Sequence, residues 1–290
     1  MSIRLNSPRA WFLAARPKTL SGALIPVLIA VAAATENGEI NVKVAVFCAL
    51  FALTMQIAAN FINDLYDFLK GTDDEERLGP ERACAQGWVS VKAMKIAIGI
   101  TLSLAIFTGF AALFSSNITN FAPIVLLGAA CIIFAFLYTT ILSYCGGGDV
   151  LVWVFFGLVP VVGTFYLLTG DITLKIILLA ISTGLVTDTL LVLNNYRDRD
   201  TDKQHGKRTL IVVFGECFGS LFYLFQGVIG AILVMGVTGQ FWTLFYLGSH
   251  IVTWQRMKRI HRGRELNGIL ARTSVNMMLF AVCVAVSLIF

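Results

Sequence analysis

Long apolar runs separated by short polar connections occupy most of this 290-residue chain. Nine of the runs approach or exceed the roughly 20 helical residues that cross the hydrocarbon core of a bilayer. A membrane barrel would instead show segments of about ten residues with alternating polarity. The pattern therefore predicts an all-α, multi-pass transmembrane helical bundle of about nine spans, forming a single domain over residues 1–290. The nine runs lie at 19–35, 42–66, 92–114, 121–141, 150–169, 173–195, 209–236, 239–255 and 273–290.

Composition agrees with a membrane-embedded chain. Hydrophobic residues make up 57% of the sequence and charged residues only 13%, whereas a soluble globular chain carries about 25% charged residues. The six cysteines form no C-x-x-C pair and have no histidine at a zinc-binding spacing. We therefore interpret the cysteines as small buried hydrophobic residues.

The positive charges lie almost entirely on one side of the expected bundle. All lysines and arginines except Lys43 and Lys175 fall in the N-terminal tail or in the connections after the second, sixth and eighth runs. Cytoplasmic loops of membrane proteins are enriched in lysine and arginine, so we expect these segments to face the cytoplasm. The net charge of +5 is then explained by contact with membrane lipid. The sequence shows no basic surface with interleaved aromatic residues, which is the pattern that would indicate nucleic-acid binding.

Two acidic segments stand out at the polar ends of the second and sixth runs. The first reads NFINDLYDFLKGTDDEERLGPERA over residues 60–83. At about 100° per residue, its Asn60, Asp64 and Asp67 fall within a narrow arc of one helix face. Asn63 lies near this arc, and Gln56 lies one turn deeper.

The second acidic segment reads NNYRDRDTDKQHGKRTL over residues 194–210. Its Asn194, Asp198 and Asp202 share a helix face in the same way. Both segments sit where an apolar run meets a basic connection on the same side of the membrane. The similar spacing is consistent with an internal structural repeat, which two short matches do not establish.

Acids gathered from two helices suggest a metal-bound anionic substrate. Mg²⁺ is held by a few carboxylates together with water and substrate phosphates, while arginine and lysine contact the remaining phosphate oxygens. A diphosphate with its hydrophobic tail in the bilayer, such as a prenyl diphosphate, has this chemistry. The alternative is that the acids form a solvated helix-end face, paired with nearby arginines and lysines.

The segments resemble those of a known family. The residues from Asn63 through Asp73 form an N-D-x-x-D-x-x-x-G-x-D pattern similar to the first aspartate motif of the UbiA superfamily of membrane prenyltransferases. The second segment, the Arg77-x-Gly79-Pro80-x-Arg82 continuation and the opening stretch 15–20 resemble the MenA branch, which prenylates 1,4-dihydroxy-2-naphthoate. One departure is Asp149, which stands where the family usually has a glutamate.

This resemblance implies nine helices around a central cavity that opens sideways to lipid, and it implies roles for individual residues. The catalytic aspartates would be Asp64, Asp67, Asp198 and Asp202. One Mg²⁺ would be held by Asn60, Asp64 and Asp67, and a second by Asn194, Asp198 and Asp202. Diphosphate contacts would come from Lys18, Arg77, Arg82, Lys207 and Arg208.

The resemblance also implies a reaction. The prenyl group of a polyprenyl diphosphate would leave as an allylic cation, and the naphthoate ring would attack it at the carbon that bears the carboxylate. Loss of CO₂ would then give demethylmenaquinone, on the route to menaquinone. The enzyme would lie in a bacterial inner membrane with its active-site loops in the cytoplasm.

Further residues are candidates for lining the cavity. Asp188 is the acid that lies well inside a span, and an ionisable residue there is by default a functional candidate. The alternative is a hydrogen-bonded packing residue. We interpret His205 as a solvated loop residue. The candidates for the cavity wall are Gln56, Asn63, Asp188, Asn195, Tyr138, Tyr144 and Asp149.

Two other functions stay open from the residues alone. A cation-coupled transporter would place ionisable groups near the membrane midplane, where only Asp188 qualifies. A prenyltransferase with another acceptor, such as 4-hydroxybenzoate or a chlorophyllide, would use the same acidic segments. The stretches 16–18 and 79–80 favour the naphthoate branch.

Overall fold

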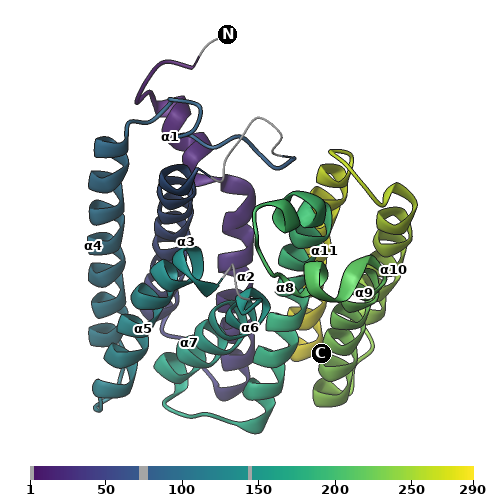
Figure 1. Ribbon diagram of the computed structural model, residues 1–290. Helices are drawn as coiled ribbons and strands as arrows, with labels where there is room; N and C mark the ends of the chain where they lie inside the picture. Colours follow the sequence, from purple (N-terminus) through teal and green to yellow (C-terminus); the bar gives the residue numbers. More distant parts are fainter. Residues whose placement is uncertain (1–2, 72–77, 143–145) are drawn as a thin grey trace.

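Helices and their connections account for the computed structural model, which describes residues 3–71, 78–142 and 146–290 (Figure 1). Over this part of the chain no β-strand is found, so the predicted all-α class is confirmed. The first half contains α1 (Pro8–Ala15), α2 (Pro17–Ala34), η1 (Thr35–Asn37), α3 (Val42–Lys70), α4 (Val91–Ser115) and α5 (Ala122–Thr140). The second half contains α6 (Gly148–Trp153), the π-helical η3 (Val154–Leu158), α7 (Val159–Thr169), α8 (Leu174–Gln204), α9 (Leu210–Thr238), α10 (Thr243–Ile260) and α11 (Leu266–Ile289).

Eight helical segments of the described chain are long and apolar enough to cross a membrane. They are α2, α3, α4, α5, the continuous α6–η3–α7 unit, α8, α9 and α11. The expected ninth, α10, has 18 residues but ends in a basic turn with Lys258 and Arg259. It packs between α9 and α11, so over the described residues eight of the nine predicted spans are found and α10 is a further long helix of the bundle. Its start at Thr243 rather than at 239 follows from Gly239, which ends α9 in the left-handed conformation.

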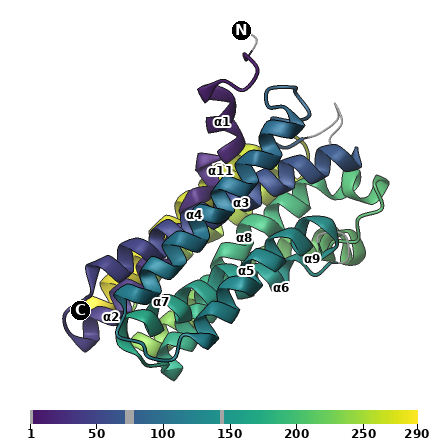
Figure 2. The same ribbon diagram turned by 90° about the vertical axis from the view of Figure 1, so that its left-hand side faces the viewer.

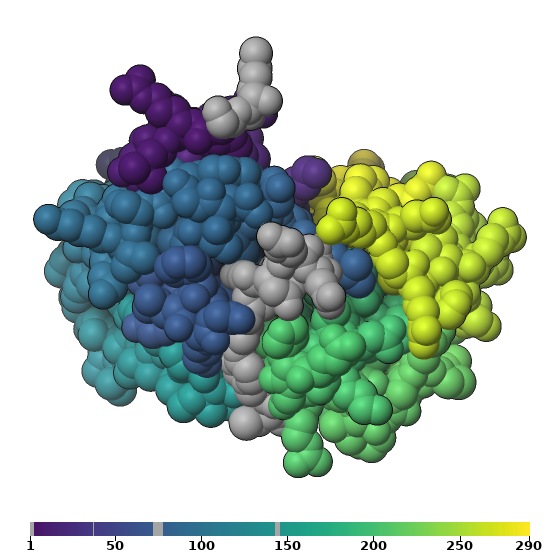
Figure 3. Space-filling view, turned by 45° about the horizontal axis from the view of Figure 1, so that its top comes forward, coloured from purple at the N-terminus to yellow at the C-terminus, as the bar shows by residue number. Residues whose placement is uncertain are grey.

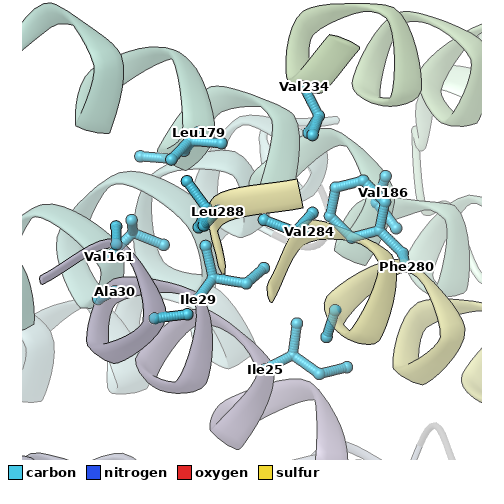
Figure 4. Packing of buried hydrophobic residues seen from close by; sticks show 14 of the residues in the cluster. Ile25, Ile29, Ala30, Val161, Leu179, Val186, Val234, Phe280, Val284 and Leu288 are labelled. Carbon is cyan, nitrogen blue, oxygen red and sulfur yellow. The ribbon is translucent and has the colours of Figure 1, made fainter. Parts of the chain in front are cut away.

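The first and last long helices close the bundle. A buried apolar cluster joins α2, α7, α8, α9, α10 and α11, with Ile29, Val186, Phe280 and Val284 among its residues (Figure 4). Helices in lipid are held together largely by such close packing, because lipid tails are as apolar as the side chains themselves. Residues from both ends of the chain therefore fix the frame in which the site lies.

Close backbone contact ties the irregular η3 segment to α8. A Cβ atom added to Gly157 would lie 2.6 Å from the carbonyl oxygen of Ala180, and one added to Gly184 would lie 2.8 Å from the carbonyl oxygen of Trp153. Small residues allow helix backbones in membranes to approach in this way. Either glycine, if replaced, would push α6–α7 and α8 apart.

The break between α1 and α2 places a cation at the polar end of the bundle. Arg16 has φ 50° and ψ 68°, in the left-handed region, and Pro17 starts α2. A residue that precedes proline is disfavoured in helical conformation, and proline is well suited to the first helical position. The chain therefore turns at Arg16.

Candidate active site

A cavity of about 770 Å³ runs through the bundle. Its wall is formed by α2, α3, α4, α5, the α6–η3–α7 unit and α8, together with the connections after α3 and α8. Figure 3 looks onto the polar end of the bundle, where the connections after α3, α8 and α10 gather. The cavity therefore joins an apolar interior to the face where the acidic segments end.

The apolar part of the cavity reaches the outer surface near α4 and α5, which lie on the side facing the viewer in Figure 2. Ile106 and Phe110 of α4 and Val125 of α5 line the cavity, yet they are 46%, 42% and 41% exposed. A wall residue with this exposure borders an opening. The cavity thus has room for a long apolar chain that extends sideways between helices.

Four polar residues of α3 line the cavity: Gln56, Asn60, Asn63 and Asp67. They follow one another at helical spacing and so form a single stripe. Asp67 accepts a hydrogen bond of 2.9 Å from Arg82 Nη2, and both side chains are less than 10% exposed. The first segment thus contributes one buried acid–arginine pair to the polar end of the cavity.

Asp64 is placed differently from the expectation. It is buried, it is absent from the cavity wall, and its carboxylate accepts hydrogen bonds from two consecutive backbone amides. The amide of Ala83 lies 2.9 Å from Oδ2 and that of Cys84 lies 2.8 Å from Oδ1. Both carboxylate oxygens of Asp64 therefore hold the connection that carries Arg82.

Asn60 lines the cavity but uses its amide to hold the α1–α2 junction. Its Nδ2 donates to the carbonyl of Ala15 at 2.9 Å and to the hydroxyl of Thr19 at 3.0 Å, while its Oδ1 accepts from Gln56. Next to this junction, Arg16 Nη1 donates to Asn63 Oδ1 at 3.4 Å. Asn60 thereby positions the turn that brings Arg16 to the cavity.

The second segment faces the cavity with its predicted acids and asparagines. Asn194, Asn195, Asp198 and Asp202 line the wall. Asp198 accepts from two nitrogens of Arg197, Nε at 2.7 Å and Nη2 at 2.6 Å, and Lys207 Nζ lies 3.5 Å from Asp202 Oδ1. Asp67, Asp198 and Asp202 are therefore each paired with a cation.

The neighbouring Arg199 points away from the cavity. Its guanidinium donates to Glu216 and to the backbone of His261, and it lies over the ring of Tyr196. Two arginines that are adjacent in the sequence pattern thus have different surroundings: one against Asp198 at the cavity and one between α8, α9 and α10.

Some of the cations predicted to bind diphosphate line the cavity, and others do not. Arg82 and Lys207 line the cavity, whereas Lys18 and Arg208 are exposed and do not line it. Arg77 lies outside the described residues. His205, interpreted from sequence as a solvated loop residue, is exposed and also borders the cavity.

The remaining candidates have mixed positions. Tyr138 and Asn195 line the main cavity and also a small recess of about 20 Å³ that contains the buried Asp149. Asp188 does not line the cavity, contrary to the expectation, because its carboxylate faces α9 and accepts a 2.7 Å hydrogen bond from Gln226. Tyr144 lies outside the described residues.

Sequence reasoning missed Arg16 and Arg197 as residues of the site. Arg16 precedes a proline at the start of a span, which is a signal for a chain turn. Arg197 is an arginine beside an acid at the polar end of a span, and it is only 3% exposed. Its place on the cavity wall, which the sequence does not give, distinguishes it from Arg199, which is also buried.

The donor set fits Mg²⁺. Among the described residues, no three histidine, cysteine or acidic side chains lie close enough to hold a metal ion by themselves. Mg²⁺ is typically bound by one or two carboxylates plus substrate phosphates rather than by an all-protein cage. Asp67, Asp198 and Asp202 offer such hard oxygen ligands on the wall of one cavity.

Comparison with known proteins places this geometry in a context. The model of the UbiA prenyltransferase family matches residues 23–287. The chain is 35% identical to a 1,4-dihydroxy-2-naphthoate octaprenyltransferase of Escherichia coli, over 73% of this chain and 71% of that protein. It is 32% identical to a protein of the same name from Mycobacterium leprae, over 95% of this chain and 94% of that one.

The fold is also similar to solved structures. The structure of a UbiA homolog from Archaeoglobus fulgidus bound to DMAPP and Mg²⁺ superimposes with a TM-score of 0.67 at 14% identity, covering 96% of this chain and 98% of that one. The apo structure of a UbiA homolog from Aeropyrum pernix K1 gives a TM-score of 0.67 at 13% identity, covering 92% and 96%.

Proposed function

The chain belongs to the UbiA prenyltransferase family, and we propose that it transfers a polyprenyl chain from polyprenyl diphosphate to 1,4-dihydroxy-2-naphthoate. The observation that supports this most directly is the cavity itself. Acids from two segments that are far apart in the sequence line its polar end, and an apolar space that opens sideways lies behind them. A diphosphate with a long hydrocarbon tail matches both parts.

In this proposal Asp67, Asp198 and Asp202, with the amides of Asn63 and Asn194, bind the Mg²⁺-diphosphate group. When bound, Mg²⁺ would stabilise negative charge on the departing diphosphate. We revise the sequence-based assignment for Asp64, whose oxygens are engaged by the backbone of Ala83 and Cys84. Its role is to position the connection after α3.

The cations at the mouth already lie beside the acids. Arg82 and Lys207, paired with Asp67 and Asp202, would contact phosphate oxygens of a bound diphosphate. Arginine contacts phosphate with two parallel hydrogen bonds, which also fixes its orientation. Before the substrate binds, each cation is therefore held by an acid, and binding of the diphosphate would change these acid–cation contacts.

The apolar wall takes the prenyl chain and keeps water from the allylic cation, which aromatic faces such as those of Phe134 and Phe155 can stabilise. The naphthoate attacks with the carbon that bears the carboxylate. The C–O bond to diphosphate breaks, the new C–C bond forms, and the carboxylate leaves as CO₂, whose bonding electron pair restores the aromatic ring; the product is the hydroquinone form of demethylmenaquinone, and its oxidation to the quinone is a separate step. No covalent intermediate with the protein is needed.

The basic connections suggest an orientation. Because lysine and arginine concentrate at the polar end that carries the site, this end would face the cytoplasm of a bacterial inner membrane. The diphosphate and the naphthoate would enter from the aqueous side, and the prenylated product would leave into membrane lipid.

A product assay tests the function. Purified protein would be incubated with Mg²⁺, a polyprenyl diphosphate and, in separate reactions, 1,4-dihydroxy-2-naphthoate, 4-hydroxybenzoate or a chlorophyllide, and products would be identified by mass. We expect prenylated, decarboxylated product from the naphthoate. Turnover of another acceptor alone would contradict the assignment of the naphthoate as the acceptor. Cation flux in proteoliposomes without any turnover would favour a transporter.

A further inference from the structure

Asn267 connects two parts of the cavity mouth that are far apart in the sequence. It lies in the first turn of α11, outside the cavity wall. Its Oδ1 accepts a 2.7 Å hydrogen bond from Arg197 Nη1, and its Nδ2 donates a 3.0 Å hydrogen bond to the carbonyl oxygen of Leu78. One side chain thus contacts both the second acidic segment and the connection that follows the first.

Both partners of Asn267 lead directly to the site. Arg197 uses its other two nitrogens to hold Asp198, at 2.7 and 2.6 Å. Leu78 lines the cavity and lies in the same connection as Arg82, which pairs with Asp67. The acids of the two segments are therefore linked through Asn267 by a continuous series of hydrogen bonds and chain.

A carboxamide is the group that this position requires. Asparagine presents an acceptor and a donor at the same end of a short side chain. A carboxylate offers acceptors only and would face the Leu78 carbonyl, whereas an aliphatic side chain offers neither. Arg197 is 3% exposed, and a buried charged donor that loses its acceptor is costly.

The same connection is also held elsewhere, besides the pair of Arg82 with Asp67. Asp64 binds the amides of Ala83 and Cys84, and Asn6 contacts the backbone at Trp88 and Ser90. Asn267 provides the attachment at the start of the described part of the connection, nearest to the second segment. Its loss would free this end while the other attachments keep the fold.

We propose that Asn267 is a positioning residue of the diphosphate site. It holds Arg197 against Asp198 and holds the connection after α3 over the cavity mouth, and so it sets the spacing between the two acidic segments. The kinetic part of this inference rests on the proposed function, whereas the structural part does not.

The test compares Asn267→Ala, Asn267→Asp and Asn267→Gln in lipid nanodiscs. Hydrogen–deuterium exchange, measured by mass spectrometry without substrate, reports the attachment of residues 78–90. We expect faster exchange near residue 78 in the Ala and Asp variants.

We also expect KM for the polyprenyl diphosphate to rise about tenfold or more in these two variants, as for loss of a hydrogen bond to a charged group, with KM for the naphthoate changed far less. Gln, which keeps both donor and acceptor, should recover most of both effects.

Asn276 provides a matched control on the same helix. Its Oδ1 accepts from Ser249 and its Nδ2 donates to Thr253, so it joins α10 to α11 away from the mouth. Asn276→Ala should lower thermal stability without faster exchange at residues 78–90 and without a selective rise in KM for the diphosphate.

Two results would overturn the proposal. One is unchanged exchange at residues 78–90 in Asn267→Ala, which would show that Asn267 does not hold the connection. The other is faster exchange with kinetic changes no different from those of Asn276→Ala, which would reduce Asn267 to a packing residue. If the wild-type protein turns over no polyprenyl diphosphate, the proposed function fails, and the exchange measurement still decides whether the bridge exists.

Discussion

The polar ends of α3 and α8 carry similar sequences but use their acids differently. In α8, Asp198 and Asp202 both line the cavity, and each is paired with a cation close to it in the sequence, Arg197 and Lys207. In α3, Asp67 lines the cavity and is paired with Arg82 fifteen residues away, while Asp64 binds backbone amides.

The comparison shows that two segments of similar sequence have different tasks: one presents its acids to the cavity, and the other also fixes the connection beside it. The α8 segment offers two acids to the cavity, one paired with Arg197 of the same helix and the other with Lys207 of the connection that follows. The α3 segment offers one acid and uses the other to fix the connection that supplies Arg82. A carboxylate that accepts two backbone hydrogen bonds is a strong anchor for a loop.

The largest effect should come from replacing one cavity-facing acid in each segment. Asp67→Asn and Asp198→Asn each remove a charged ligand for the Mg²⁺-diphosphate while keeping the size of the side chain. We expect kcat/KM to fall by at least about a hundredfold in both, comparable to losing one group that stabilises charge in a transition state. Steady-state rates over a range of Mg²⁺ concentrations measure this. Near-normal rates in either variant would contradict its assignment.

A smaller effect should follow from Asp64→Asn. The carboxamide can accept only one of the two amide hydrogen bonds, so the other buried amide loses its partner, at a cost of about 1–3 kcal/mol. We expect the connection to loosen and the buried thiol of Cys84 to react faster with a maleimide, read by peptide-resolved mass spectrometry. Cys48 and Cys283, buried in the bundle, serve as internal controls. Activity should fall less than in Asp67→Asn, and a Mg²⁺ dependence altered as strongly as in Asp67→Asn would show that Asp64 binds the metal after all.

The two buried arginines of α8 sharpen the comparison further. Lysine cannot hold a carboxylate with two parallel hydrogen bonds, so Arg197→Lys should raise KM for the polyprenyl diphosphate about tenfold. Arg199→Lys, which weakens contact with Glu216 on the far side of the helix, should lower thermal stability without this change in KM. The same kinetic effect in both variants would mean that the cavity-facing position of Arg197 has no special role.

The smallest effect is expected at the exposed cation next to the site. Arg208 is exposed and does not line the cavity, whereas Lys207 pairs with Asp202. Arg208→Ala should change kcat/KM by no more than about twofold, since exposed charges interact weakly. Lys207→Ala should have a clearly larger effect. Equal losses in the two variants would show that Arg208 reaches the substrate.

Much of this arrangement could be predicted from the sequence, because helix length and polarity decide it. The nine apolar runs predicted the long helices, and the helical spacing brought Asn194, Asp198 and Asp202 to one face. The same geometry put Asp64 at the edge of the α3 face, about 60° from Asp67. Only the connection after α3, whose amides meet Asp64, decides that this residue turns out of the cavity.

Other features depend on tertiary contacts that no local pattern contains. Arg197 and Arg199 are alike in sequence, and their separation depends on where α9 and α11 pack around α8. Asp188 was a candidate for the cavity until Gln226 of α9 provided its partner. Arg16 reaches the cavity because Asn60 of α3 holds the turn between α1 and α2.

Binding of an unreactive substrate analogue tests the central claim most directly. A polyprenyl thiolodiphosphate, in which sulfur replaces the bridging oxygen, would be titrated calorimetrically into the wild-type protein and into Asp67→Asn and Asp198→Asn, with and without Mg²⁺. We predict Mg²⁺-dependent binding to the wild type that is strongly weakened in each variant, because acids of both segments bind the same ligand. Full-strength binding to either variant, or binding to the wild type that is indifferent to Mg²⁺, would contradict the account.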